Sequence, residues 1–264
     1  MKELEIIDTM KDDVPERCLI FSEIGVGKST LANSAPKPIF INLENRISQI
    51  KAKSFRIPET YEDLRTQLVY LLKNKHDFET VVLDTIDAME MLVYRHVCKK
   101  NNINSMSDLP YAAAYNQAET IIAKIIDGLN MLRDERNMRI IALAHSHVKL
   151  YNNPLGADYD KIKIKLRDKN AELFLERFDI IGYLHIPIYT FNAEKGFGVK
   201  KTKGSGGQER VFSCYKNVSF IGKNSYGIDY DIDIPKIKGY DAILDAISQG
   251  RKEQQQEEEE SLKE

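Results

Sequence analysis

One segment constrains the fold of this chain more than any other. A short apolar run, residues 18–21, leads into a loop with the sequence SEIGVGKST and then into helix-forming residues. The glycines Gly25 and Gly27 let successive backbone N–H groups turn toward one point, and the first turn of a helix adds further donors. Such a loop binds anions, phosphate in particular. The segment therefore predicts a strand, a phosphate-binding loop and a helix, in that order.

The loop matches the Walker A pattern GxxxxGK[ST], except that Ser22 replaces the first glycine. In this pattern Lys28 reaches the β- and γ-phosphates of ATP, and the Ser29 hydroxyl faces Mg²⁺. The alternative is a strand-to-helix turn that holds no ligand. We expect the cofactor-binding residues to be Ser22, Glu23, Ile24, Gly25, Val26, Gly27, Lys28, Ser29 and Thr30.

Further apolar runs of strand length each end at a polar residue. They are residues 38–41 before Asn42, 80–83 before Asp84 and 140–144 before His145, with another run at 180–188. Stretches with helical spacing alternate with them, at 28–33, 60–73, 86–99 and 115–136. This alternation predicts an α/β fold with a mainly parallel central sheet flanked by helices. Ligands bind at the carboxyl ends of such strands, so these polar residues are expected to meet the loop.

The composition changes after about residue 190. We expect one domain over residues 1–250, with a core at about 17–190 and a β-rich extension at about 191–250. Residues 195–208 are rich in Gly and Lys, which predicts a hairpin tip or a loop. The last segment, 251–264, is charged and of low complexity and predicts a disordered acidic tail.

Composition excludes several classes of protein. The net charge of −2 leaves no overall attraction to nucleic acid or membranes, so such binding requires a local basic patch. The three cysteines are widely spaced, without a CxxC, which argues against a disulfide framework. No signal peptide or membrane-length apolar run is evident, and we expect a cytoplasmic protein that does not bind membranes.

The remaining parts of an ATP-hydrolysing site can be placed on the strand ends. Asp84 follows an apolar strand, as in a Walker B motif, and is expected to bind Mg²⁺ together with Ser29. Thr85 stands where many ATPases have a catalytic glutamate. We therefore assign the water-activating base to Glu44, with Asp87 as the second choice, and the γ-phosphate sensor to His145.

A basic segment follows the strand that ends in His145. Lys161, Lys163, Lys165 and Arg167 alternate with apolar residues, which on a strand places all four cations on one face. Tyr151 and Tyr159 lie nearby and could stack on bases. A basic face with aromatic rings binds single-stranded nucleic acid, whereas lysines on a strand also occur simply to keep a sheet edge soluble.

With these segments located, the chain resembles a family of phage-encoded P-loop ATPases with a RecA-like core, some described as RecA-like single-strand annealing proteins. The resemblance covers about residues 17–234 and rests on GVGKST, NLE, VVLDTID, IIALAHSHVK, FDIIGYL and GKNSYG. It implies that Glu44, Asp84 and His145 serve the ATP site and that the segment after His145 binds DNA. It also implies a cation supplied by a neighbouring subunit, for which Lys223 or Arg210 is suitably placed.

Three functions are consistent with these features. The preferred one is an ATPase of phage recombination or replication that acts on single-stranded DNA as a homo-oligomer, ring or filament, together with a single-strand-binding protein. The second is a nucleotide-operated binding module with little hydrolysis, suggested by Ser22 and by the absence of an acid beside Asp84. The third is a kinase, which needs an arginine-rich lid. The densest arginine cluster, Arg133, Arg136 and Arg139, is expected on the side of the sheet away from the loop.

Overall fold

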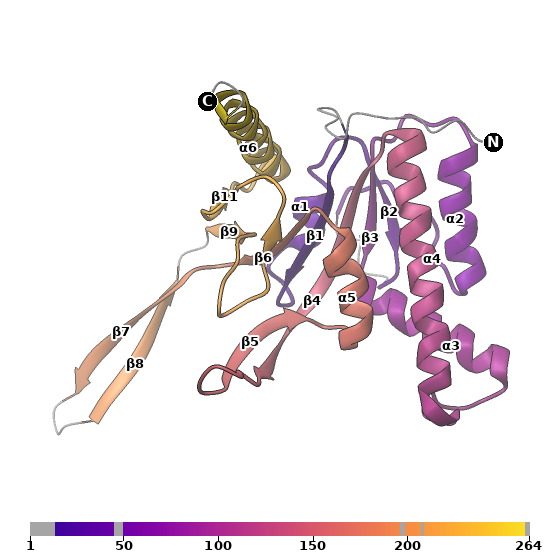
Figure 1. Cartoon of the computed structure of the whole chain (residues 1–264), viewed down its shortest axis with the longest axis horizontal. Coiled ribbons are helices and arrows are strands. Elements are labelled where there is room, and N and C mark those ends of the chain that lie inside the picture. The colour runs from indigo at the N-terminus through magenta and orange to yellow at the C-terminus, as the bar shows by residue number, and fades with distance from the viewer. Residues whose placement is uncertain (1–13, 45–49, 196–198, 207–208, 262–264) are drawn as a thin grey trace.

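A computed structural model describes residues 14–44, 50–195, 199–206 and 209–261. Within these residues nine strands form one sheet, in the order β11-β9-β6-β1-β4-β3-β2, with β10 paired to β6 and β5 to β4 (Figure 1). The strands β2, β3, β4, β1 and β6 are parallel, as predicted. The bounds are β1 (Arg17–Ser22), β2 (Pro38–Asn42), β3 (Thr80–Asp84), β4 (Arg139–Tyr151), β5 (Tyr159–Ile164), β6 (Ile180–His185), β9 (Arg210–Ser213), β10 (Lys223–Asn224) and β11 (Ile232–Ile234).

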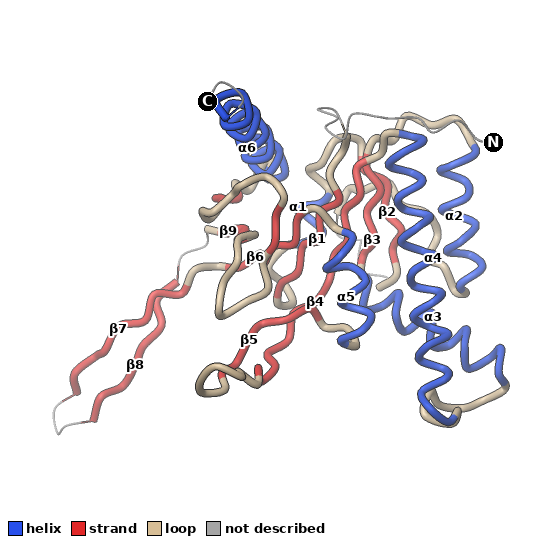
Figure 2. Tube along the Cα trace, viewed as in Figure 1, coloured by secondary structure: helices blue, strands red, loops and turns tan. Residues whose placement is uncertain are grey.

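The remaining strands, β7 (Ile188–Lys195) and β8 (Val199–Gly206), form a separate antiparallel pair. Figure 2 shows the helices on both sides of the main sheet. None of the helices within the described residues is long and apolar enough to cross a membrane. The helices are α1 (Lys28–Ala32), α2 (Tyr61–Lys73), α3 (Ile86–Asn101), η2 (Pro110–Ala112), α4 (Ala113–Arg136), α5 (Asp168–Arg177) and α6 (Gly239–Ser261).

The central strands are buried on both faces, and alternate residues serve different cores. On β1, Leu19 and Phe21 face the core formed with α2, α3, α4 and α5. Cys18 and Ile20 face a second core, formed with α1, α6 and the strands β9 and β11. This period-two division explains why each central strand is apolar throughout its length. The α/β class and the parallel flanked sheet are confirmed.

The structure differs from the sequence prediction in three places. The strand that ends at the sensor position continues far past His145, because residues 146–151 of β4 pair with β5. Arg167, predicted on the basic strand, lies instead directly before α5, whose Ala171 and Phe174 enter the first core. The prediction of a disordered tail from residue 251 is wrong for residues 251–261, which form the last part of α6.

Helix α6 contacts the rest of the molecule through Arg251, beyond the end of its apolar stripe. The Arg251 guanidinium donates to the Val14 carbonyl at 2.8 Å and lies over the Tyr226 ring, 5.2 Å from its centroid. Nearer its start, α6 is tied to the sheet by Tyr240. The buried Tyr240 hydroxyl donates to Glu16 Oε1 at 2.8 Å, and Glu16 also pairs with Arg139 at the start of β4.

Removing the Tyr240 hydroxyl should therefore destabilise the fold without opening a cavity. We expect Tyr240→Phe to lower the free energy of unfolding by about 2 kcal/mol, because a buried carboxylate loses one of its donors. Urea unfolding measures the change, with Tyr230→Phe as a control because Tyr230 is 44% exposed. Equal unfolding midpoints for the two variants would contradict the assigned role.

Candidate functional site

The phosphate-binding loop lies between the end of β1 at Ser22 and the start of α1 at Lys28. Gly25 has φ of 86° and Gly27 has φ of 100°, both in the left-handed region that favours glycine. At Gly27 a side chain would also meet Arg210 at 2.7 Å. The two glycines thus take the backbone angles that the Walker A pattern predicts.

The Lys28 ammonium is buried at the base of the loop. Its Nζ lies 3.1 Å from Ser22 Oγ and 3.3 Å from the carbonyl oxygens of Ser22 and Glu23. The Ser22 hydroxyl accepts from Lys28 and donates to the Glu23 carbonyl at 2.7 Å. The Ser22 hydroxyl therefore provides an additional hydrogen-bond acceptor for the Lys28 ammonium. The sequence pattern, which registers Ser22 only as a missing glycine, did not reveal this role.

The two predicted magnesium ligands contact each other. Ser29 Oγ donates to Asp84 Oδ2 at 2.7 Å, although Asp84 is two strands away from the loop. Burial raises the pKa of the Asp84 carboxyl, and the hydrogen bond from Ser29 opposes that rise. A hydroxyl and a carboxylate beside a phosphate-binding loop are the oxygen ligands that Mg²⁺ takes from proteins with nucleotides. These residues fit an ATP–Mg²⁺ complex.

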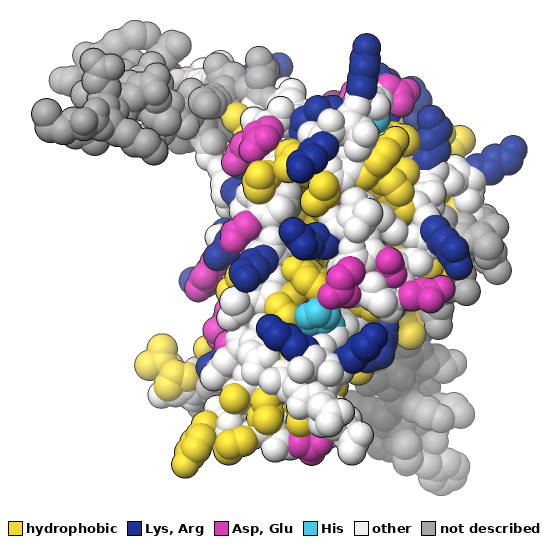
Figure 3. Space-filling model, turned by 90° about the vertical axis from the view of Figure 1, so that its right-hand side faces the viewer, with side chains coloured by type: hydrophobic (Ala, Val, Ile, Leu, Met, Phe, Trp, Pro, Cys, Tyr) yellow, Lys and Arg dark blue, Asp and Glu magenta, His cyan; other side chains and the backbone are white. Residues whose placement is uncertain are grey.

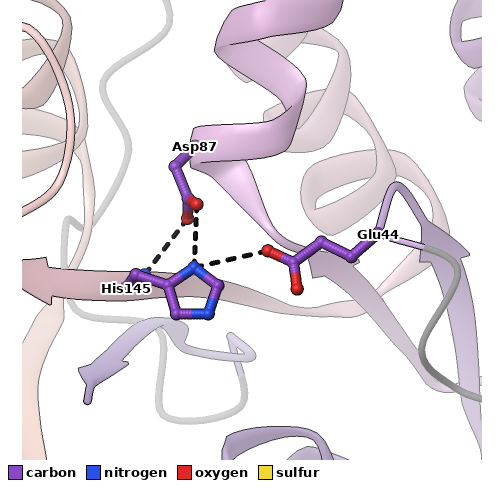
Figure 4. A group of neighbouring side chains, drawn as sticks. All are labelled: Glu44, Asp87 and His145. Carbon is purple, nitrogen blue, oxygen red and sulfur yellow. Dashed lines mark hydrogen bonds and ion pairs between the residues drawn. The ribbon is translucent and has the colours of Figure 1, made fainter. Parts of the chain in front are cut away.

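Glu44, Asp87 and His145 converge from three elements beside this pair (Figure 4). Glu44 follows β2, Asp87 lies in the first turn of α3, and His145 lies on β4. The His145 ring Nδ1 is 2.8 Å from Asp87 Oδ2 and 3.3 Å from Glu44 Oε1, and its backbone N–H donates to Asp87 Oδ1 at 3.1 Å. Asp87 therefore fixes both the backbone and the ring of His145.

The two candidate bases differ in their surroundings. Burial raises the pKa of the Asp87 carboxyl, but the hydrogen bonds from the His145 ring and amide outweigh it, so the pKa is lowered. Both carboxylate oxygens of Asp87 therefore form hydrogen bonds with His145. Glu44 instead has Oε1 held by the Thr85 hydroxyl at 2.5 Å. Thr85, which the sequence showed only as a missing glutamate, positions Glu44, and Asp87 is better placed to hold His145 than to activate water.

One cavity of about 180 Å³ is lined by Glu44, Asp84, Thr85 and His145, together with Ile24, Ile50 and residues of the phosphate loop. The cavity brings Lys28, Ser29, Glu44, Asp84 and His145 together, as the strand-end argument predicted. A larger cavity of about 560 Å³ lies between α2 and α3, and its lining includes none of them. The chemistry of the residues, rather than the size of the cavity, identifies the site.

The basic segment forms one face of a hairpin made by residues 146–151 of β4 and by β5, here called the β4–β5 hairpin. Lys161 and Lys163 lie over the Tyr151 ring, with their Nζ atoms 5.7 and 5.8 Å from its centroid. The Tyr159 ring is 5.1 Å from the Tyr151 ring. Lys165 follows the strand and is exposed.

Arg167 does not share this basic face. Its guanidinium pairs with Glu119 and lies over the Tyr115 ring, 4.5 Å from the centroid, and both partners belong to α4. The backbone turns after Ile164 because Arg167 precedes the first residue of α5. The strict alternation that predicted four cations on one face therefore ends before Arg167.

Both cations considered for a trans role, Lys223 and Arg210, donate hydrogen bonds within their own chain. The Lys223 ammonium donates to the carbonyls of Leu175 and Glu176, at 2.8 and 3.3 Å, and so caps the carboxyl end of α5. Arg210 lies beside the phosphate loop of its own chain, where it donates to the Gly27 carbonyl at 3.3 Å.

The arginine cluster considered as a kinase lid has structural partners. Arg133 Nε donates to the Pro15 carbonyl at 2.7 Å, and Arg139 pairs with Glu16. Arg136 Nη2 donates to the Asn74 carbonyl at 2.9 Å. Arg139 begins β4 and Glu16 precedes β1, so the cluster lies at the end of the sheet opposite the loop. This arrangement argues against a kinase lid.

Comparison with known proteins agrees with this site. A family model described as an AAA domain matches residues 15–226, which is most of the chain. The chain therefore belongs to the AAA domain family, and its site is that of a nucleotide-binding P-loop ATPase family. No curated protein sequence matches the chain.

Lys28 offers the most direct test of the site. We expect Lys28→Ala to reduce ADP and ATP affinity at least about tenfold, because a charged hydrogen-bond donor to the phosphates is lost. Calorimetric titration measures the affinity, and Lys37→Ala is the control, since Lys37 forms an exposed ion pair with Glu79 at 2.6 Å. Unchanged nucleotide binding by Lys28→Ala would rule out the loop as the site.

Proposed function

We propose that this protein is an ATPase that acts on single-stranded DNA, in phage recombination or replication. The observation that carries the proposal is the path of β4. This strand places His145 in the nucleotide site and then continues into the basic face of the β4–β5 hairpin, which begins at His147. One strand thus connects the candidate nucleotide site to the candidate DNA-binding face.

In the proposed reaction the loop holds ATP. Lys28 and the backbone N–H groups of the loop bind the phosphates, and Ser29 and Asp84 hold Mg²⁺. Bound Mg²⁺ would neutralise the charge that develops on the phosphate oxygens. The hydrogen bond between Ser29 and Asp84 holds both oxygens side by side.

Glu44 is the proposed general base for the attacking water. Its carboxylate lies on the wall of the same cavity as Lys28, and its side chain is 17% exposed, so water can reach it. Thr85 fixes one of its oxygens. His145, held by Asp87, is the proposed contact of the terminal phosphate. Its ring also orients the neighbouring Glu44 carboxylate, 3.3 Å away. A general base of this kind accelerates a reaction by about 10²–10⁴-fold.

The basic face is suited to single-stranded DNA by its charge and by its aromatic rings. Burial lowers the pKa of the Lys161 ammonium, and the charges of Lys163 and Lys216 lower it further, which shows how closely cations gather here. Tyr151 and Tyr159 add aromatic surface on which bases can stack. The face formed by α2, α3 and α4 differs, because cations and acids alternate over it (Figure 3).

A second function has a specific observation in its favour. Glu44 Oε1 accepts from Thr85 at 2.5 Å and lies 3.3 Å from the His145 ring, so the base is tethered. If the tether persists when ATP binds, the protein is a nucleotide-operated binding module with little hydrolysis. Assembly into a ring or filament and contact with a single-strand-binding protein belong to the first proposal, by resemblance to RecA-like proteins.

Replacing Glu44 separates hydrolysis from binding. We expect Glu44→Gln to lower kcat at least about 100-fold while ATP affinity changes little, because the amide cannot accept the proton from water. Asp87→Asn should cost less, since it disturbs only the placement of His145. Single-turnover hydrolysis and calorimetry measure the two effects. Turnover too low to measure in both Glu44→Gln and the wild type, with tight ATP binding, would favour the binding-module alternative, whereas equal and measurable kcat values would show that Glu44 is not the base.

Replacing Lys161, Lys163 and Lys165 together with Ala should weaken binding of single-stranded DNA. We expect the slope of log affinity against log salt concentration to become about 2 units shallower, because each lost phosphate contact removes about 0.7. Fluorescence anisotropy at several salt concentrations measures the slope.

The matched control replaces three exposed lysines of helices α3 and α4, Lys99, Lys100 and Lys124. This control should leave the slope unchanged, and both triple variants should still bind ATP. If the two triple variants show the same slope, the DNA surface lies elsewhere.

A further inference from the structure

Arg210 is the first residue of β9 and stands where the C-terminal extension meets the phosphate loop. Its guanidinium donates to two carbonyl oxygens, Gly27 at 3.3 Å through Nη1 and Pro235 at 3.3 Å through Nη2. Gly27 ends the loop, and Pro235 follows β11. One planar side chain thus bridges two segments that are far apart in the sequence.

The charge of Arg210 has no local counterpart. Within the part of the chain that the structure describes, no carboxylate lies at ion-pair distance from its guanidinium, which donates to two neutral carbonyls. Burial lowers the pKa of this guanidinium without any carboxylate to offset it. A partly buried cation with only carbonyl partners is uncommon, because desolvating a charge is costly.

The space around Gly27 is fitted to this side chain. A Cβ on Gly27 would meet Arg210 Nη1 at 2.7 Å, and a Cβ on Gly239, where α6 begins, would meet Leu31 of α1 at 3.0 Å. The Gly27 carbonyl also accepts from Leu31 N–H at 3.0 Å, the first hydrogen bond of α1. Arg210 therefore contacts the peptide group that fixes the angle between loop and helix.

We propose that Arg210 is a positioning residue acting in cis: it braces the phosphate loop at Gly27 and couples the loop to β9 and to the segment after β11. The brace holds the left-handed Gly27 peptide in the orientation that turns the loop N–H groups inward. It also makes the extension part of the nucleotide-binding unit. This role differs from that of a finger that reaches the site of a neighbouring subunit.

The inference rests on the proposed function only for nucleotide binding, so it is tested with ADP, which requires neither hydrolysis nor DNA. The variants are Arg210→Ala and Arg210→Lys. Arg177→Ala serves as a matched control, because Arg177 forms an exposed pair with Asp127 at 2.6 Å. Lys223→Ala represents the other cation considered for a trans role.

We expect Arg210→Ala to weaken ADP and ATP binding by the same factor, about tenfold, because the loop and not the γ-phosphate is affected. Arg210→Lys should restore part of the affinity, since an ammonium can still donate to one of the two carbonyls. KM should rise while kcat stays within about twofold. Unchanged ADP affinity in Arg210→Ala would overturn the inference. If the wild type itself fails to bind ADP, the proposed function fails instead.

Subunit mixing separates cis from trans action. Lys28→Ala subunits keep Arg210, and Arg210→Ala subunits keep an intact loop. Action in cis predicts that a mixture hydrolyses ATP no faster than the average of its two components. Recovery of turnover above that average would show that Arg210 serves a neighbouring subunit, and it would overturn the proposal.

Discussion

The parallel register of the central strands is the constraint on which the site depends. Ser22 on β1 lies opposite His145 on β4, and Asn42 on β2 lies opposite Asp84 on β3. Because side chains alternate along a strand, a slip of one residue would turn these polar groups into the wrong face. The apolar residues before them, buried in two separate cores, fix the register. Packing of the sheet therefore positions the polar site residues at the carboxyl ends of its strands.

Much of this arrangement could be predicted from the sequence, because the signals are local. Apolar strand-length runs ending at Asp84 and His145 indicated both the parallel sheet and the edge where ligands bind. What could not be predicted depends on specific side-chain contacts, within the phosphate loop or between distant segments. The pairing of Ser22 with Lys28, of Thr85 with Glu44 and of Asp87 with His145 follows from the way loops close over strand ends. No periodicity in the sequence encodes such contacts.

The errors have equally physical causes. Alternation of charge suggested that Arg167 shares the lysine face, but helix α5 begins directly after it and its guanidinium pairs with α4. Low complexity suggested disorder from residue 251, but α6 continues to Ser261, with Arg251 bonded to the Val14 carbonyl. Lys223 and Arg210, which the resemblance suggests as trans-acting cations, have hydrogen-bond partners in their own chain, and their role toward a neighbouring subunit stays a prediction.

The central claim is that β4 joins ATP hydrolysis to single-stranded DNA. It is tested most directly by steady-state ATP turnover of the intact protein while single-stranded DNA is titrated, with duplex DNA of the same length as the comparison. The account predicts that turnover rises and saturates with single-stranded DNA and responds less to the duplex. Measurable turnover that ignores both forms of DNA, in a protein that binds neither, would contradict it.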